Sequence, residues 1–307
     1  MIQTPIAFAG NPLDRAAARR KDEGWVAERR ADPRAELVLL WRGEVLHERG
    51  AGGSRLLPLT MDALAECGGP EPVLLGLRGV PDGGDAPVWA ADAGNLPAAP
   101  FAELGSWGPL RTLAPYLPPG ELAVAGQAAW LLDWHRRHAF CARHGGPTVS
   151  AEGGGKRVNP ETGTEHFPRT DPVAIVLPVH GDAVCLGRGP RFPPGFLSAF
   201  AGFMEPGETL EECAARELHE EAGLVATTMR YRMSQPWPFP ASLMMGCRGE
   251  ALTTEIHCDP EELDDAIWVT REEMMQVFAG EHPKIRPARK GAIAHFLLQN
   301  WLADTLD

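Results

Sequence analysis

One segment, residues 202–224, constrains the fold more than any other part of the chain, because it marks both ends of a helix. It reads GFMEPGETLEECAARELHEEAGL. Thr209 is followed three residues later by Glu212, a capping box that predicts a helix beginning at Leu210. Gly223 suits the left-handed position just past the end of that helix. The apolar residues share one side and predict packing on a sheet: Leu210, Ala214, Ala215, Leu218 and Ala222.

Three glutamates occupy the adjacent arc of this helix. Glu217, Glu220 and Glu221 are separated by three and four residues, which makes their side chains neighbours. Each pair of like charges costs roughly 0.2–0.5 kcal/mol, and each anion in the last turns opposes the helix dipole by roughly 0.3–1 kcal/mol. A bound divalent cation removes both costs, because Mg²⁺ takes hard oxygen ligands. The alternative is a solvated acidic face without a ligand.

The spacing of the whole segment resembles the Nudix signature. A glycine, five residues and Glu208 are followed by seven residues and the run RELHEEAGL at 216–224. Nudix hydrolases cleave a nucleoside diphosphate that is linked to another group. The resemblance implies a Nudix α/β/α sandwich in an α+β or α/β chain, with Mg²⁺ or Mn²⁺ ions, two or three of them, on the glutamates.

A second motif, SQPWPFPAS at residues 234–242, narrows the substrate. Its three prolines hold the backbone extended and exclude a helix. Trp237 and Phe239 therefore lose little freedom when a flat ring stacks on them. Alone, the segment is better explained as a proline-rich loop whose aromatic residues fill the core. After a Nudix segment, it resembles the NADH pyrophosphatase subfamily, which acts on nicotinamide dinucleotides.

That resemblance implies a role for each matching position. It makes Glu217, Glu221 and Glu262 the principal metal ligands, with Glu220 as a further ligand or the base. The carbonyl of Ala201 adds another metal contact. Residues implied to line the dinucleotide site are Phe167, Gln235, Pro236, Trp237, Pro238, Phe239, Pro240, Ala241, Ser242 and Ala294. Residues implied to have structural roles are Gly202, Glu208, Arg216 and Gly223, with Arg216 paired to Glu208.

The chain departs from this subfamily in the zinc ribbon that usually joins its two domains. Where the subfamily has four cysteines, this chain has Cys141, His144, Asn159 and Thr162. Cys141 and His144 keep one pair of possible ligands, but Asn and Thr are poor ligands for zinc. We therefore expect no structural zinc and a connector that keeps its shape through hydrogen bonds and packing.

The chain is long enough for two domains with separate cores. We expect a β-rich domain at 1–120, a helix plus degenerate ribbon connector at 121–170, and the Nudix domain at 171–307. Strands of the first domain are predicted at 36–41, 44–46, 73–77 and 88–91, and the helix that precedes the ribbon connector is predicted at 121–140. The Nudix domain is predicted to contain strands at 173–179, 183–187, 229–234, 242–247 and 267–270, and a closing helix at 290–303.

Composition places the protein among soluble globular chains, with 44% hydrophobic and 23% charged residues. No apolar run approaches the roughly 20 residues that a membrane helix needs. We expect a cytoplasmic protein whose six scattered cysteines stay reduced. The net charge of −12 argues against non-specific binding to nucleic acid through a broad basic surface. A homodimer is implied by the resemblance alone.

The expected activity is hydrolysis of NADH or NAD⁺ to nicotinamide mononucleotide and AMP. Three alternatives remain open. The same site would remove NAD caps from RNA 5′ ends, or it would take a broader range of nucleoside diphosphate derivatives such as ADP-ribose. The third alternative is a sensor that binds dinucleotides without cleaving them.

Overall fold

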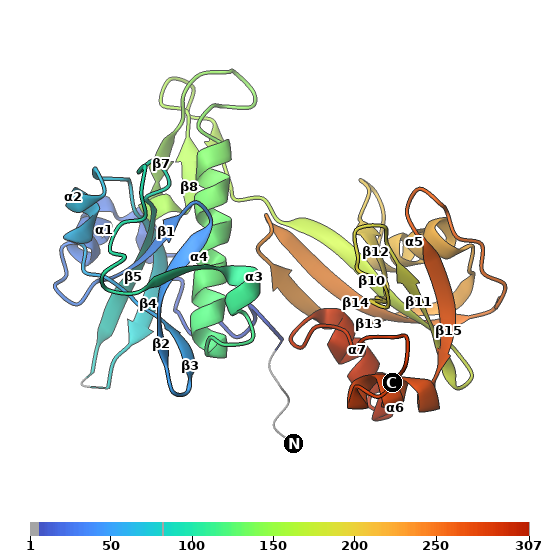
Figure 1. The fold of residues 1–307 in the computed structure, drawn as a ribbon. Coiled ribbons are helices and arrows are strands. Elements are labelled where there is room, and N and C mark those ends of the chain that lie inside the picture. Colours follow the sequence, from blue (N-terminus) through green and yellow to red (C-terminus); the bar gives the residue numbers. More distant parts are fainter. Residues whose placement is uncertain (1–5, 82, 307) are drawn as a thin grey trace. The chain divides into compact units, whose positions relative to one another are not determined.

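The computed structural model describes residues 6–81 and 83–306 and divides into two compact units (Figure 1). The N-terminal unit consists of Ala7–Arg169 and of Trp237–Ala241. The C-terminal unit contains residues 170–236 and 242–306. Among the described residues, the structure contains no helix with the length and apolar character required to cross a bilayer.

The C-terminal unit is built around one mixed sheet. Its strands follow the order β13-β14-β10-β11-β15, and β12 pairs with β10. The sheet contains β10 Asp171–His180, β11 Ala183–Arg188, β12 Phe200–Phe203, β13 Ala226–Trp237, β14 Ser242–Ala251 and β15 Asp265–Thr270. Its helices are α5 Leu210–Ala222, α6 Arg271–Ala279 and α7 Ile293–Leu302.

Alternating side chains of β10 enter two separate cores. Ile175 and Leu177 pack with residues of α6 and α7, whereas Ala174 and Val176 pack with α5. This alternation follows from the two-residue period of a strand. The sheet is therefore covered on both faces, which confirms the predicted α/β/α sandwich.

Helix α5 forms where the sequence predicts it. The Thr209 side chain accepts a hydrogen bond from the Glu212 N–H, and the Glu212 carboxylate accepts one from the Thr209 N–H. Gly223 has a φ of 68°, and its N–H donates to the His219 carbonyl. The apolar side of the helix packs on the sheet, with Ala214, Leu218 and Ala222 fully buried.

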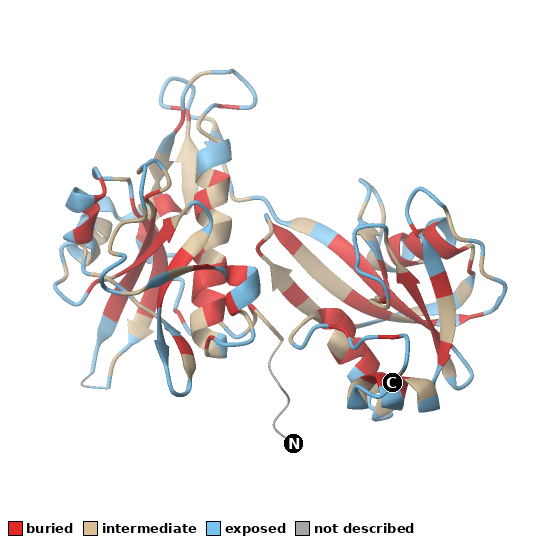
Figure 2. Cartoon of the chain, viewed as in Figure 1, coloured by how far each residue is buried: buried red, intermediate tan, exposed pale blue. Residues whose placement is uncertain are grey.

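The N-terminal unit is also sheet-based, with the strand order β3-β2-β1-β5-β4 and β6 paired to β2. Its strands are β1 Glu36–Trp41, β2 Glu44–Gly50, β3 Gly53–Leu56, β4 Val73–Gly79, β5 Asp85–Asp92 and β6 Ser106–Pro109. Its α-helices are α1 Glu23–Arg30, α2 Ala63–Glu66, α3 Leu110–Leu113 and α4 Pro119–Arg137. Figure 2 shows buried residues on the strands of this sheet and along α4.

Helix α4 has different bounds from the helix predicted at 121–140. The helix starts two residues earlier, at Pro119, because proline is well suited to the first helical turn, where its missing N–H has no partner to lose. It ends at Arg137. One face of α4 contributes Leu122, Val124 and Leu132 to the core beneath the N-terminal sheet. The domain boundary expected after residue 120 stays a prediction.

The connector after α4 is a small three-stranded sheet. Its strands are β7 Val149–Ala151, β8 Lys156–Val158 and β9 Glu165–His166, in that order across the sheet. Two elements of the C-terminal unit were not predicted: the four-residue strand β12 and the helix α6.

Candidate active site

Two glutamates of α5 are buried one helical turn apart. Glu217 and Glu221 are each only 8% exposed, whereas Glu220 points to solvent. The Ala201 N–H of strand β12 donates to Oε1 of Glu221 at 2.9 Å, which fixes that carboxylate against the sheet. The pKa of Glu221 is raised to about 7, chiefly by burial and additionally by the nearby charges of Glu217 and Glu262. Burial also raises the pKa of Glu217.

Gly202 on β12 makes room for the Glu217 carboxylate. A β-carbon built on Gly202 would lie 2.0 Å from Cδ of Glu217, closer than any side chain tolerates. The glycine that opens the Nudix segment is therefore required by a close approach between strand and helix. The sequence implied a structural role for Gly202 without identifying this contact.

Arg216 connects the acidic residues to one another. Its Nε and Nη2 donate to the two carboxylate oxygens of Glu208 at 2.6 and 2.9 Å, which is the pairing predicted from the sequence. Its Nη1 also donates to Glu217 at 2.7 Å and to Glu220 at 2.8 Å. The Arg216 guanidinium holds the pKa of Glu208 at about 2. Arg216 therefore orients two predicted metal ligands in addition to bracing the loop.

Glu262 lies on an exposed loop that is attached to the end of α5. The Asp259 N–H donates to the Glu221 carbonyl at 3.2 Å, and the Glu262 N–H donates to the Asp259 carbonyl at 3.1 Å. Because the Glu262 charge raises the pKa of both buried glutamates, its carboxylate acts on the same site. Within residues 6–81 and 83–306, no three side chains of His, Cys, Asp or Glu are gathered closely enough to hold a metal ion.

Gln235 of the second motif is bound to the start of α7. It is 1% exposed, its Nε2 donates to the Gly291 carbonyl at 2.9 Å, and its Oε1 accepts from the Ile293 N–H at 2.8 Å. These contacts satisfy a helix end that has no side-chain cap of its own. Ala294 follows in the first turn of α7 and is buried. Ser242 is buried at the first position of β14.

The aromatic residues of the same motif belong to the N-terminal unit. Trp237 and Phe239 lie 5.9 and 5.6 Å from the ring of Phe8, both edge to face. The guanidinium of Arg111 lies 4.3 Å from the ring centroid of Phe239 and 5.6 Å from that of Trp237. Sequence reasoning missed Phe8 and Arg111, because nothing local marks either residue. Phe167, the other predicted stacking residue, is 64% exposed.

The connector closes its second turn with an asparagine. Asn159 is 1% exposed, and its Oδ1 accepts from the N–H groups of Glu161 at 2.9 Å and Thr162 at 3.1 Å. The Thr162 hydroxyl bonds to that of Thr164. In the first turn, Cys141 is buried and its backbone bonds to Gly145 and Gly146. Cys141 and His144 are of the types that zinc prefers, thiolate and imidazole, whereas Asn159 and Thr162 do not supply a second pair of this kind.

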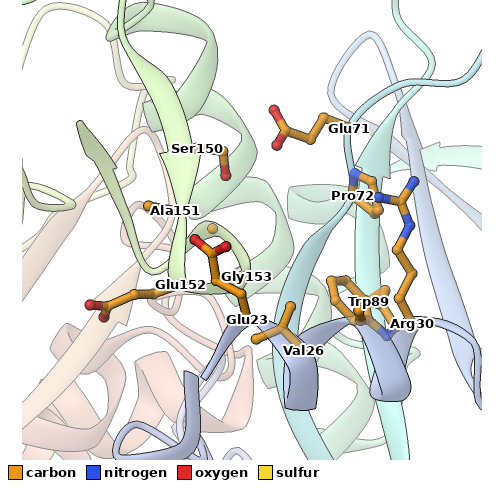
Figure 3. Close-up of a pocket in the computed structure, with 12 residues that line it drawn as sticks. Glu23, Val26, Arg30, Glu71, Pro72, Trp89, Ser150, Ala151, Glu152 and Gly153 are labelled. Atoms are coloured by element: carbon orange, nitrogen blue, oxygen red, sulfur yellow. The ribbon is translucent and has the colours of Figure 1, made fainter. Parts of the chain in front are cut away.

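The N-terminal unit also contains a cavity of about 350 Å³ (Figure 3). Its lining includes the ring of Trp89 and the charged residues Glu23, Arg30, Glu71 and Glu152. None of the residues predicted to bind metal or substrate lines this cavity. It is therefore separate from the predicted active site.

Three family models match consecutive parts of the chain. A NADH pyrophosphatase-like rudimentary NUDIX domain matches residues 34–134, and a NADH pyrophosphatase zinc ribbon domain matches residues 136–167. The NUDIX domain matches residues 168–296. Because the zinc ribbon model matches the connector, the expectation that it holds no zinc stays a prediction.

Several curated relatives are named NAD-capped RNA hydrolases. NAD-capped RNA hydrolase NUDT12 of Macaca fascicularis is 42% identical over 59% of this chain, but the match spans only 42% of that relative. NAD-capped RNA hydrolase NudC of Stutzerimonas stutzeri is 38% identical over 65% of this chain and 69% of its own length. NudC of Mycobacterium bovis is 37% identical over 82% of both chains. Its sequence, its α/β/α unit and these matches together place the chain in the NudC group of the Nudix hydrolase family.

Proposed function

We propose that the protein hydrolyses the pyrophosphate bond of NADH or NAD⁺, giving nicotinamide mononucleotide and AMP. One observation carries this proposal, namely the side-by-side burial of Glu217 and Glu221 on α5. Burying two like charges is unfavourable unless a cation compensates them, and both carboxylates have raised pKa values. In a Nudix protein, such a cation also binds the phosphates of the substrate.

Glu217, Glu221 and Glu262 would hold two or three Mg²⁺ or Mn²⁺ ions, with the Ala201 carbonyl as a further ligand. The donor set fits, because these hard cations take carboxylate and carbonyl oxygens. When bound, the ions supply charge stabilisation to the phosphates and acidify a bound water.

The side chains around the ions have separate tasks in this proposal. Glu220, the exposed member of the cluster, is a further ligand or the base that accepts the proton of the attacking water. The water oxygen bonds to one phosphorus while the bridging P–O bond breaks, and the second phosphate leaves with the bridging oxygen. Arg216 keeps Glu217 and Glu220 oriented through its hydrogen bonds, and Glu208 fixes Arg216 in turn.

The substrate class follows from the second motif. We assign the segment 235–242, Phe167 and the first turn of α7 to recognition of the dinucleotide. Gln235 bonds to the backbone of Gly291 and Ile293, so we expect it to orient the backbone of Ala294.

A second candidate is removal of an NAD cap from the 5′ end of RNA. It is supported by relatives that are named NAD-capped RNA hydrolases, one of them 37% identical over 82% of both chains. The bond broken is the same pyrophosphate, so the two activities require the same glutamates. ADP-ribose hydrolysis and non-catalytic sensing remain the weaker alternatives.

A substrate panel tests these proposals. The protein with Mg²⁺ or Mn²⁺ is incubated with NADH, NAD⁺, ADP-ribose and an NAD-capped RNA, and the products are weighed by mass spectrometry. AMP plus the mononucleotide from NADH supports the main proposal, and a 5′-monophosphate RNA supports the second. Tight binding of NADH without any product would show a sensor.

We also propose that the connector folds without zinc and that the protein is a cytoplasmic homodimer. The first proposal is supported by Asn159, whose side chain closes the turn in which a ligand pair is missing. Elemental analysis after chelation should give less than one zinc per chain, and a stoichiometric, tightly held zinc would contradict it. Sedimentation of the purified chain tests the dimer, and fractionation of cells tests the location.

A further inference from the structure

Five cationic side chains gather on two loops of the C-terminal unit. Arg191 lies on one loop, and Lys284, Arg286, Arg289 and Lys290 lie on the other. All five are exposed, and none has an acidic group within 4.0 Å in the described part of the chain. In a chain with a net charge of −12, a group of unpaired cations is conspicuous. We call these five residues the cationic patch.

Direct contacts hold the two loops together. The Arg286 N–H donates to the Gly195 carbonyl at 2.8 Å, and Arg286 forms a parallel bridge with Phe196. The Arg289 guanidinium lies 5.9 Å from the ring of Phe196, which in turn lies 5.0 Å from the ring of Phe192. The close approach requires Gly195, since a β-carbon there would lie 2.3 Å from the Lys284 carbonyl. The cations therefore form one surface with Phe192, which is 42% exposed.

The cationic patch adjoins the proposed active site at both of its ends. At one end, Gly189 lies beside Glu262. A β-carbon built on Gly189 would be 3.6 Å from the carbonyl oxygen of Glu262. The neighbouring Asp264 N–H donates to the Arg188 carbonyl at 2.9 Å. At the other end, Gly291 follows Lys290 directly and accepts the hydrogen bond from Gln235. A chain of phosphates that leaves the proposed site on this side of the C-terminal unit would therefore lie against these cations.

We infer that the cationic patch binds the phosphodiester backbone of a single-stranded RNA whose capped 5′ end occupies the active site. Exposed Lys and Arg neutralise phosphates and release counterions, and an aromatic face such as that of Phe192 stacks on a base of any sequence. The overall negative charge disfavours binding of RNA through a broad surface, so a local group of cations is needed to hold it. Free NADH has no phosphodiester chain, so the patch contributes nothing to its turnover. This inference rests on the proposed function in its capped-RNA form.

The test replaces three cations at once: Lys284→Gln, Arg286→Gln and Arg289→Gln. We expect kcat/KM on a capped single-stranded RNA to fall roughly 10–100-fold at low salt, with NADH turnover unchanged. The slope of log kcat/KM against log salt should become shallower by about 2, since each phosphate contact on a single strand contributes about 0.7. The matched control is Arg19→Gln, Lys21→Gln and Arg30→Gln, which removes one Lys and two Arg from exposed positions of the N-terminal unit. This control should leave kcat/KM on capped RNA and the turnover of NADH unchanged.

A second variant separates stacking from charge. Phe192→Ala should lower kcat/KM on capped RNA about tenfold without altering the salt slope. Unchanged RNA kinetics in the triple variant would overturn the inference, as would an equal loss on NADH. A change of oligomeric state in the triple variant would show instead that the patch joins two copies of the chain. If wild-type protein cleaves NADH but not capped RNA, the inference fails while the proposed function stands; if it cleaves neither, the proposed function fails.

Discussion

The two units of the molecule use the same strand pairing but differ in the helix that follows it. In the N-terminal unit, β1 pairs antiparallel with β2 and parallel with β5. In the C-terminal unit, β10 pairs antiparallel with β11 and parallel with β14. In each unit, a helix lies in the sequence between the antiparallel partner strand and the parallel one. This helix is α2, with four residues, in the N-terminal unit and α5, with 13 residues, in the C-terminal unit. The description of residues 34–134 as a rudimentary NUDIX domain agrees with this difference.

The comparison separates what the sheet does from what the helix does. The N-terminal sheet buries a core on each face although α2 has only four residues, so packing of a unit does not require a long helix at this position. Helix α2 has a single acidic residue, Glu66, and no side-chain cap. Helix α5 has a capping box and the buried pair Glu217 and Glu221. The chemistry therefore depends on the length, capping and acidic face of one helix.

The largest expected effect comes from removing a charge on that acidic face. Glu221→Gln keeps the shape of the side chain and should lower kcat on NADH roughly 10²–10³-fold, as the loss of an important electrostatic contact does. Glu66→Gln on α2 is the matched control and should leave kcat unchanged. Steady-state kinetics at saturating Mg²⁺ measure both. Near-normal turnover in Glu221→Gln would show that the acidic pair is not the metal site.

The same substitution should change the pH dependence of stability. The pKa of Glu221 in the folded protein is about 7, above its ordinary value of 4.5. Stability from this group is therefore full below pH 4.5 and is lost as pH rises through 7. In metal-free protein, the free energy of unfolding of Glu221→Gln relative to that of wild type should rise by roughly 3 kcal/mol between pH 4.5 and pH 8. Melting curves in chelator at both pH values test this, and a difference independent of pH would contradict it.

A third prediction concerns Trp237 and Phe167, two aromatic residues of the N-terminal unit. Trp237→Ala should lower the unfolding free energy by roughly 1–3 kcal/mol, because the ring packs on Phe8 and is only partly buried. Phe167→Ala should leave it within about 0.5 kcal/mol, because Phe167 is exposed. If both rings stack on nicotinamide, both variants should lose activity on NADH and spare ADP-ribose. Loss on both substrates in Trp237→Ala alone would indicate that its role is packing.

The smallest expected effect tests the caps of the two helices. Thr209→Ala should destabilise the C-terminal unit by about 1 kcal/mol, because it removes the N-cap of α5. Asp62→Ala at the corresponding end of α2 should cost less than about 0.5 kcal/mol, because that side chain caps nothing. Chemical denaturation of both variants provides the measurement. Equal costs would mean that α5 does not depend on its cap.

Local signals in the sequence predicted the parts of the fold that depend on neighbouring residues. Helix α5 begins and ends where Thr209 and Gly223 predict. Helix α6 has the same signals, a capping box at Thr270 and Glu273 and a left-handed Gly280, so it was predictable and was missed. Strand β12 was not predictable in this way, because four residues with a central glycine carry little strand signal.

Contacts between distant segments account for the rest of the site. Arg216 is an exception: the sequence implied its pairing with Glu208, and its bond to Glu220, four residues along the same helix, was predictable and was missed. The ring contacts of Trp237 with Phe8 join residues more than 200 positions apart. No spacing rule within a single sequence reports such a contact.

The hairpin tip Trp237–Ala241 has a consequence for dissecting the protein. The tip connects β13 to β14 in the chain, yet it belongs to the N-terminal unit. A truncated catalytic fragment starting at residue 170 would keep the tip and lose Phe8 and Arg111. Two aromatic rings would then face water at the end of an otherwise intact hairpin, and the fragment would be prone to self-association. The two units are therefore better separated by point substitutions than by cutting the chain.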